Sequence, residues 1–261
     1  QEVEHLFRII NMLRDRGCGI IYISHKMEEI LRISDEVTIM RDGQWVATRP
    51  AKELTMDEII RLMVGRTIYE EPKTKSMCPP DAPVVLEAEH LCSLDVKDVS
   101  FQLRKGEILG FAGLVGAGRT ETMRLICGAD PMDSGVIRVG GKQVRIHSPK
   151  DAVRHGIGYL SEDRKRYGLC LNLSIADNTV LPSLQQLFKG PFVNDRAAHR
   201  HAQDYVEKIR TKTPSTRARV GSLSGGNQQK VFIARWLNIG ADVLLFDNPT
   251  QGVDVGAKAE I

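Results

Sequence analysis

The feature that most constrains the fold of this chain is a serine-glycine turn at residues 223–229, which read LSGGNQQ. The turn opens a segment with helical periodicity, so we predict a helix over 227–238. A short apolar run at 243–247 follows and ends in an aspartate. Such a run is typical of a buried parallel strand. The order therefore predicts a helix that leads back to a strand of a parallel sheet.

A second glycine-rich turn, GLVGAGRT at residues 113–120, follows an apolar run at 108–112 that we predict to be a buried strand. Backbone N–H groups of such a turn can surround a phosphate, while a lysine reaches the outer phosphates and a hydroxyl binds magnesium. Thr120 supplies the hydroxyl, but Arg119 stands in place of the lysine. Arginine keeps the charge but is planar and forked, which puts the geometry of the last phosphate in doubt. The alternative is a turn that only tightens a strand–helix corner.

Candidate magnesium ligands lie near two strand ends. Asp247 ends its strand where a magnesium-side carboxylate belongs. Glu162 follows a predicted strand at 157–160 and is a candidate to sense the metal. Asn248 stands where a water-polarising glutamate is usual, and an amide cannot accept a proton at neutral pH. The alternatives are a strand-end aspartate that starts a turn and, around Glu162, a solvated run of charges.

The remaining pattern alternates strands, loops and helices, which predicts an α/β fold of the P-loop type with a parallel core sheet. A proline-rich linker is expected at 68–83. We predict helices at 3–16, 27–33, 56–64 and 121–126, a buried strand at 20–24, a hairpin at 37–47, antiparallel strands at 84–89 and 96–103, and a largely helical segment at 151–220.

Composition excludes some classes of function. The net charge of +3 over 261 residues is too small to indicate a nucleic-acid partner. No apolar run reaches the length of a membrane span. The 5 cysteines have no metal-ligand spacing, so we expect reduced thiols, three of them buried. The sequence starts at Gln1 and ends at Ile261 inside helical patterns, so both ends are expected to be cut.

The segments 106–121, 162–165, 223–230 and 252–256 resemble those of ATP-binding cassette (ABC) proteins. The strongest resemblance is to the double-cassette ATPase subunits of bacterial monosaccharide importers of the ribose, galactose and arabinose type. It implies an ABC cassette with a parallel core sheet, an antiparallel β subdomain and a helical signature subdomain. Residues 1–67 resemble the C-terminal part of a first cassette, 68–83 a linker, and 84–261 a second cassette that lacks its C-terminal tail.

The resemblance also implies an activity, which is ATP hydrolysis with Mg²⁺ that energises import of a monosaccharide. Expected partners are transmembrane permease subunits, a periplasmic sugar-binding protein reached indirectly, and a second cassette in cis or in trans, at the cytoplasmic face of the bacterial inner membrane. Each nucleotide in such proteins lies between the glycine loop of one cassette and the signature turn of the other.

By that resemblance the candidate site residues fall into groups. The glycine loop contributes Gly113, Gly116, Ala117, Gly118, Arg119, Thr120 and Glu121. The signature contributes Ser224, Gly225, Gly226, Asn227 and Gln228, which serve the nucleotide of the other cassette. Candidate catalytic residues are His25, Asp247, Asn248 and Glu162, and candidate metal ligands are Thr120, Asp247 and Glu162. Asp254 resembles an aspartate that couples the two sites.

Four residues bear on activity at the chain's own site. Arg119 in place of lysine and Glu162 in place of glutamine are typical of the second cassette in that family. Asn248 replaces an expected glutamate, and Gln251 stands where arginine is frequent. We therefore predict a weak or inactive second site. A nucleotide-binding regulatory half and a truncated fragment without hydrolysis are the alternatives.

Two tests of these predictions are structural. The signature can serve another molecule only if Gly225 is not enclosed within its own domain. A further hypothesis is that residues 1–67 dock where the missing tail of the second cassette belongs. It requires the predicted strand at 20–24 to join the sheet that holds 243–247.

Overall fold

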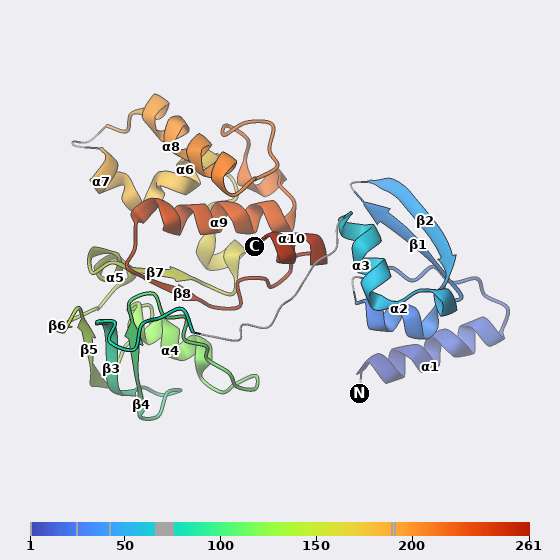
Figure 1. The fold of residues 1–261 in the computed structure, drawn as a ribbon, viewed down its shortest axis with the longest axis horizontal. Helices are drawn as coiled ribbons and strands as arrows, with labels where there is room; N and C mark the ends of the chain where they lie inside the picture. The colour runs from blue at the N-terminus through green and yellow to red at the C-terminus, as the bar shows by residue number, and fades with distance from the viewer. Residues whose placement is uncertain (1, 25, 42, 66–75, 189, 191) are drawn as a thin grey trace. The chain divides into compact units, whose positions relative to one another are not determined.

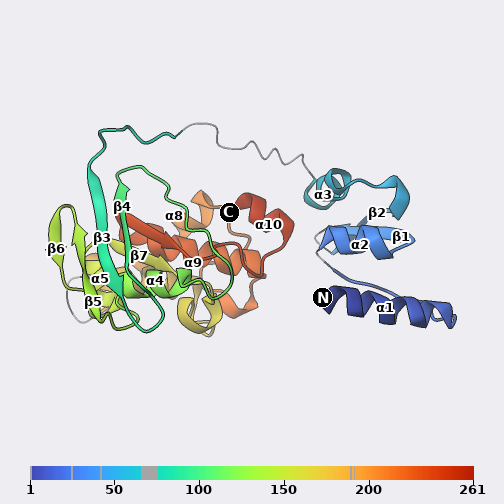
Figure 2. The same cartoon turned by 90° about the horizontal axis from the view of Figure 1, so that it is seen from below.

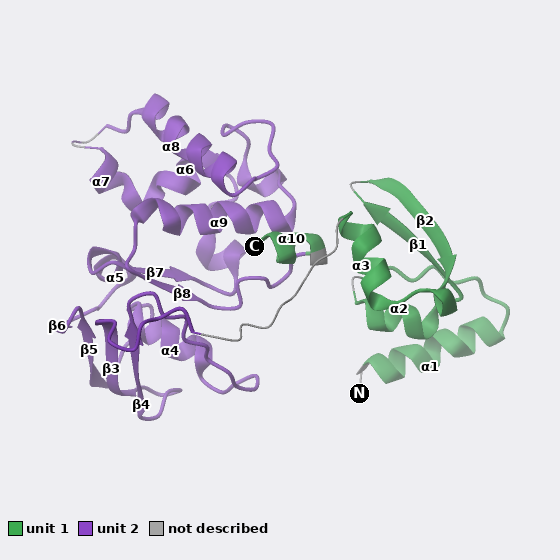
Figure 3. Ribbon diagram, viewed as in Figure 1, with its two compact units in different colours: residues 1–71, 254–261 green, residues 72–253 purple. Residues whose placement is uncertain are grey.

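A computed structural model describes residues 2–24, 26–41, 43–65, 76–188, 190 and 192–261. It divides into two compact units (Figure 3), residues 1–71 with 254–261 and residues 72–253. The predicted cassette boundaries are a different division, which these units do not test. Half of the predicted linker, 68–75, lies outside the described residues.

The first unit combines short helices with a hairpin (Figure 1). Its elements are α1 Glu2–Asp15, α2 Met27–Ile33, β1 Glu36–Arg41, β2 Gln44–Pro50, α3 Met56–Val64 and α10 Val255–Glu260. Helices α2 and α3 pack with the hairpin around a small core that includes Met27, Ile39 and Ile59. A capping box of Thr55 and Glu58 starts α3, and Gly65 ends it in the left-handed conformation. The predicted helices and hairpin of this unit are confirmed.

The second unit begins with an antiparallel sheet of order β4-β3-β5-β6. Its strands are β3 Val84–Cys92, β4 Val99–Arg104, β5 Ser134–Val139 and β6 Lys142–Val144. Helix α4, Arg119–Ile126, shares a core with this sheet, in which Leu86, Leu125 and Ile126 are almost fully buried. The predicted antiparallel subdomain is therefore confirmed.

A parallel pair of strands, β7 Ile157–Leu160 and β8 Val243–Phe246, forms the other sheet of this unit. Helix α5, Pro149–Arg154, packs against β7. Helix α9, Gly225–Ile239, also packs on β7, and α6 Ile175–Val180 and α8 Asp195–Lys208 pack on α9 (Figures 1 and 2). Helix α7 is Leu184–Leu187. The predicted helical segment and signature helix are confirmed, and α9 begins two residues earlier than expected.

Two predicted buried strands are wrong. The runs 20–24 and 108–112 form no strand, and Ile21, Ile23 and Ile108 are 92%, 91% and 82% exposed. Buried parallel strands form only when neighbours take up their backbone hydrogen bonds. In the described residues, β7 and β8 pair only with each other. The described run 20–24 is not a strand, so it lends the docking hypothesis no support, and that hypothesis stays a prediction.

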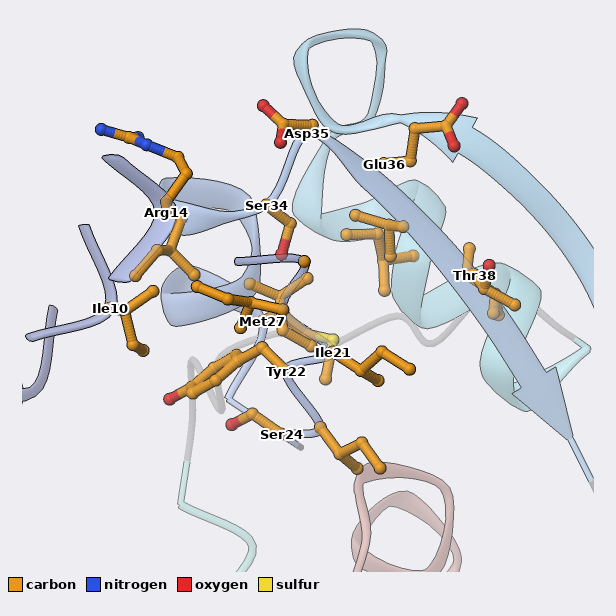
Figure 4. Close-up of a pocket in the computed structure, with 18 of the residues that line it drawn as sticks. Ile10, Arg14, Ile21, Tyr22, Ser24, Met27, Ser34, Asp35, Glu36 and Thr38 are labelled. Carbon is orange, nitrogen blue, oxygen red and sulfur yellow. The ribbon is translucent and has the colours of Figure 1, made fainter. Parts of the chain in front are cut away.

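The unpaired run 18–24 leaves the first unit with an open core. A cavity of about 790 Å³ lies among α1, α2, β1 and this run. Its interior is largely apolar, and Figure 4 shows the side chains of Ile10, Ile21, Tyr22 and Met27 gathered around it. No helix in the described part of the chain has the length and apolar character needed to cross a bilayer.

The cysteines also differ from expectation, because only Cys127 is buried. Cys78 and Cys92 are half-buried, and Cys18 and Cys170 are exposed. The prediction of three buried cysteines is therefore wrong. Cys127 follows α4, where it packs with the antiparallel sheet.

We expect alkylation by iodoacetamide at pH 8 to label Cys18 and Cys170 and to leave Cys127 unlabelled until the chain unfolds. Burial raises the pKa of the Cys127 thiol to about 11, and only the thiolate reacts. Mass spectrometry of peptides labelled with and without denaturant measures the difference. Labelling of Cys127 at the rate of Cys170 in the folded chain contradicts this expectation.

Candidate nucleotide-binding site

The glycine loop is closely folded and leads directly into helix α4. Gly116 and Gly118 have φ of 81° and 82°, a conformation that glycine adopts without strain. A Cβ at Gly113 would lie 2.8 Å from Cβ of Ala117 and 3.5 Å from Cδ of Arg119. The loop can therefore curl this tightly only without a side chain at position 113. It presents the amino end of α4 to whatever the loop encloses, an arrangement that suits a phosphate.

The loop is open to solvent. Residues 113–117 and Arg119 are exposed, and Thr120 and Glu121 are half-buried at the start of α4. An arginine and a hydroxyl are thus available to an anion at this helix end. Within the described residues, no hydrogen bond joins Thr120 to Asp247.

Asp247 is held at the end of β8 by the neighbouring strand. Its backbone N–H donates to the carbonyl oxygen of Leu160 at 2.9 Å, and the hydroxyl of Tyr159 donates to its Oδ2 at 3.1 Å. Burial, and then the negative charge of Asp247, raise the pKa of Tyr159, so this hydroxyl stays protonated. Sequence reasoning missed Tyr159. No local signal marks this residue, because its place near Asp247 follows from the strand register, which pairs Tyr159 with Leu245, two residues before Asp247.

Asn248 connects the ends of the two parallel strands. Its Nδ2 donates to Oε1 of Gln251 at 3.0 Å and, more weakly, to Oε1 of Glu162 at 3.5 Å. Asn248 has a φ of 49°, which asparagine tolerates better than most residues. The structure therefore brings the candidate residues Glu162, Asp247 and Asn248 to one edge of the β7–β8 sheet.

The carboxylates at this edge suit a magnesium ion that a nucleotide also binds better than a metal site built from protein ligands alone. No cluster of three or more His, Cys, Asp or Glu side chains in the described residues could hold a metal ion. Magnesium is usually bound by one or two carboxylates together with substrate phosphates and water. Asp247 and Glu162 can supply the carboxylates, and Thr120 can supply a hydroxyl.

The signature turn presents free amides to its surroundings. Ser224 caps α9 through its backbone, and its Oγ accepts a hydrogen bond from Nδ2 of Asn227 at 2.9 Å. In the described chain, the N–H groups of residues 225–227 form no hydrogen bond. Ser224 is exposed and Gly225 is half-buried, so the turn meets the condition that Gly225 be accessible. Unbonded amides at the start of a 15-residue helix are suited to binding an anion.

Two of the signature residues are enclosed by the rest of the fold. Gly226 and Gln228 are buried. Nε2 of Gln228 donates to the carbonyl oxygen of Leu223 at 3.0 Å, so this side chain holds the turn in shape. Of the five signature candidates, Ser224, Gly225 and Asn227 are therefore the ones that a ligand can reach.

His25 lies outside the described residues, but its neighbours belong to one network. Glu29 accepts hydrogen bonds from Tyr22 at 2.8 Å and Ser24 at 3.4 Å and pairs with Lys26 at 3.0 Å.

Asp254, the candidate coupling residue, accepts a hydrogen bond from the N–H of Ala257 at 2.8 Å and so caps α10.

The fold and these motifs define an ATP-binding cassette, and the comparisons agree. Residues 96–251 match the family model described as ABC transporter, so the chain belongs to that family. A dimeric, post-hydrolysis ATP-binding cassette bound to ADP and phosphate has a TM-score of 0.57 and 20% identity, over 67% of this chain and 79% of that one. A nucleotide-free cassette from an ABC transporter has a TM-score of 0.56, also at 20% identity, over 68% of this chain and 74% of that one.

Relatives of higher identity are sugar-import proteins. The chain is 53% identical to a putative ribose/galactose/methyl galactoside import ATP-binding protein 1 of Burkholderia lata, over 100% of this chain and 51% of the relative. It is 49% identical to the ribose import ATP-binding protein RbsA of Lactococcus lactis, over 100% of this chain and 53% of that relative. The chain thus spans about half the length of the curated relatives it matches.

Proposed function

We propose that this chain is part of the ATP-binding subunit of an importer and that ATP bound with Mg²⁺ energises import of a monosaccharide. The names of the similar proteins support the substrate class, because they are ribose and galactose import proteins. The observation that carries the proposal is the signature turn, where backbone amides at residues 225–227 that form no hydrogen bond in the described chain begin helix α9.

The signature amides serve a nucleotide held by another cassette. Ser224, Gly225 and Asn227 can approach a triphosphate, and the amino end of α9 favours its negative charge. The interaction forms only when the two cassettes close, so closure depends on the nucleotide. Under this assignment residues 1–67 are the C-terminal part of a first cassette and 84–261 are most of a second, and His25 contacts the γ-phosphate at the shared site.

The chain's own glycine loop holds a second nucleotide with weak or no hydrolysis. Loop amides, Arg119 and Thr120 bind the phosphates, while Asp247 and Glu162 approach the magnesium ion. Asn248 cannot take a proton from water at neutral pH. The residues present therefore favour binding over turnover.

The partners follow from the same assignment. Transmembrane permease subunits bind the cassettes directly, a periplasmic sugar-binding protein acts through them, and a second cassette pairs in cis or in trans. The subunit is peripheral at the cytoplasmic face of the inner membrane, and nucleic acid is not a partner.

Binding of mant-ATP, measured by fluorescence, together with phosphate release tests this function. We expect binding that requires Mg²⁺ and is reduced by Gly116→Glu, with little phosphate release from the chain alone. Full turnover in the chain alone contradicts the weak site. Binding without turnover, even when a lysine-bearing cassette is added, favours a regulatory half. Absence of binding leaves an inactive fragment.

Replacing Tyr159 with Phe is expected to raise the Mg²⁺ concentration needed for half-maximal mant-ATP binding by about 10-fold. The variant removes a hydrogen bond to a carboxylate, a contact worth about 1.5 kcal/mol or more. A magnesium titration at fixed mant-ATP measures the shift.

The matched control is Tyr167→Phe, because Tyr167 is 56% exposed and stacks with Arg166 rather than contacting Asp247. We expect this control to titrate like the wild type. Equal titrations for Tyr159→Phe and the wild type would show that Tyr159 does not orient a magnesium ligand.

A further inference from the structure

Arg164 is a buried cation that the proposed mechanism does not yet use. It begins a short π-helical turn, Arg164–Gly168, two residues after Glu162. Its side chain belongs to a residue only 9% exposed. The carboxylate of Asp163 caps this turn by accepting the N–H groups of Lys165 and Arg166, both at 3.0 Å.

The guanidinium of Arg164 is bound by backbone carbonyls of a distant loop. Nη1 donates to the carbonyl oxygen of Gln251 at 2.7 Å, and Nη2 donates to that of Gly252 at 3.1 Å. Nε is buried and has no hydrogen-bond partner in the described residues. The arginine therefore ties the segment that carries Glu162 to the loop that follows Asp247 and Asn248.

The same guanidinium also lies against the signature turn. A Cβ at Gly225 would lie 3.0 Å from Nη2 of Arg164 and 3.0 Å from the carbonyl oxygen of Gly252. The absence of a side chain at position 225 is what allows the three segments to meet. Arg164 consequently lies where the Glu162 segment, the loop 251–252 and the start of α9 converge.

The electrostatics of this junction favour an anion. Within the described residues the guanidinium hydrogen-bonds two carbonyl oxygens and no carboxylate, and it lies beside the positive end of helix α9, so a negative charge bound there would be favourable. Keeping this buried charge out of water costs free energy. A neutral side chain of similar length would avoid that cost but would neither attract an anion nor bridge two carbonyls.

We infer that Arg164 is a positioning residue that couples the chain's own nucleotide site to its signature turn. A nucleotide that engages Glu162 shifts the turn 164–168, and the guanidinium moves the loop 251–252 and the first turn of α9 with it. The amides offered to the other cassette's nucleotide are thereby aligned only when this chain's own site is filled. The inference rests on the proposed function, since it assumes a nucleotide at the glycine loop.

The test measures nucleotide binding and its structural response separately in the whole chain. Mant-ATP fluorescence gives the dissociation constant. Hydrogen exchange with and without magnesium and the non-hydrolysable analogue AMP-PNP reports on peptides covering 222–232 and 247–253. In the wild type we expect AMP-PNP to slow exchange about threefold or more in both peptides. In Arg164→Met we expect a dissociation constant within about threefold of the wild type, but no nucleotide-dependent change in 222–232.

Two further variants make the result specific. Lys165→Met removes a charge from the exposed neighbouring residue and should respond like the wild type. Gly225→Ala retains Arg164 but places a methyl group against Nη2, so it should lose the response as Arg164→Met does. If Arg164→Met does not fold, as judged from hydrogen exchange in strand β3, Gly225→Ala serves as the test variant instead.

The possible outcomes distinguish a failure of the proposed function from a failure of the coupling alone. A wild-type chain that does not bind mant-ATP overturns the proposed function and the coupling with it. Binding without any response in 222–232 overturns the coupling alone. An undiminished response in folded Arg164→Met also overturns the coupling alone.

Discussion

The double variant Glu162→Gln with Asn248→Glu, which exchanges the amide and the carboxylate between these two positions, is expected to raise ATP turnover at the chain's own site about 100-fold, an effect typical of a general base. Asn248 and Glu162 already face each other as amide and carboxylate, 3.5 Å apart. By family resemblance the usual order is the reverse, with glutamine at 162 and glutamate at 248. The double variant places a carboxylate at position 248 without placing it against a second carboxylate at position 162.

Each single variant should remain slow, for a different reason. Glu162→Gln leaves the site without a base. Asn248→Glu places a second carboxylate beside Glu162, so one of the pair is favoured in its protonated form. It also puts glutamate at a φ of 49°, which costs about 1 kcal/mol.

Phosphate release should be measured across a series of protein concentrations, because the site is completed by the signature of another cassette. Asn248→Gln, which keeps an amide, is the matched control and should match the wild type. A double variant no faster than Asn248→Gln would show that the exchanged charges do not limit turnover, and would leave Arg119 as the limiting residue.

Replacing Arg235 with Met is expected to lower the free energy of unfolding by about 3 kcal/mol, because several buried acceptors lose their donor. Arg235 lies on α9 and is 7% exposed. Nε and Nη2 donate to the backbone oxygen and Oδ1 of Asn178 at 2.9 and 3.0 Å, and Nη1 donates to the carbonyl oxygen of Gly168. The arginine thus fastens the signature helix to α6 and to the turn that Arg164 begins.

Urea denaturation followed by circular dichroism measures this loss. Arg200→Met on the exposed surface of α8 is the control and should change stability by no more than about 0.5 kcal/mol. Equal stability of Arg235→Met and Arg200→Met would mean that the desolvation cost of the buried charge cancels its hydrogen bonds.

The local elements could be predicted from the sequence because their signals are local. Thr55 and Gly65 mark the two ends of α3, and the serine-glycine turn at 224–226 marks the start of α9. Apolar runs identified β7 and β8, and both lie in one parallel sheet. For the same reason the candidates Glu162, Asp247 and Asn248 meet at the carboxyl ends of these strands.

Features that depend on distant partners could not be predicted. Residues 20–24 and 108–112 have the composition of buried strands, but a strand also needs a neighbour to pair with. The bridge made by Arg164 joins residues 87 and 88 positions apart, and nothing in its local sequence indicates burial. Tyr159 is similar, because its role follows from the register between β7 and β8.

The exposed runs 20–24 and 108–112 have a practical consequence for handling this polypeptide. Each is an uncharged, β-prone stretch with no backbone–backbone hydrogen bond among the described residues, and such unpaired backbone can seed intermolecular sheets. The chain in isolation should accordingly form amyloid-like or amorphous aggregates on concentration. A lysine in place of Ile21 or Ile108 should act as a gatekeeper that delays precipitation.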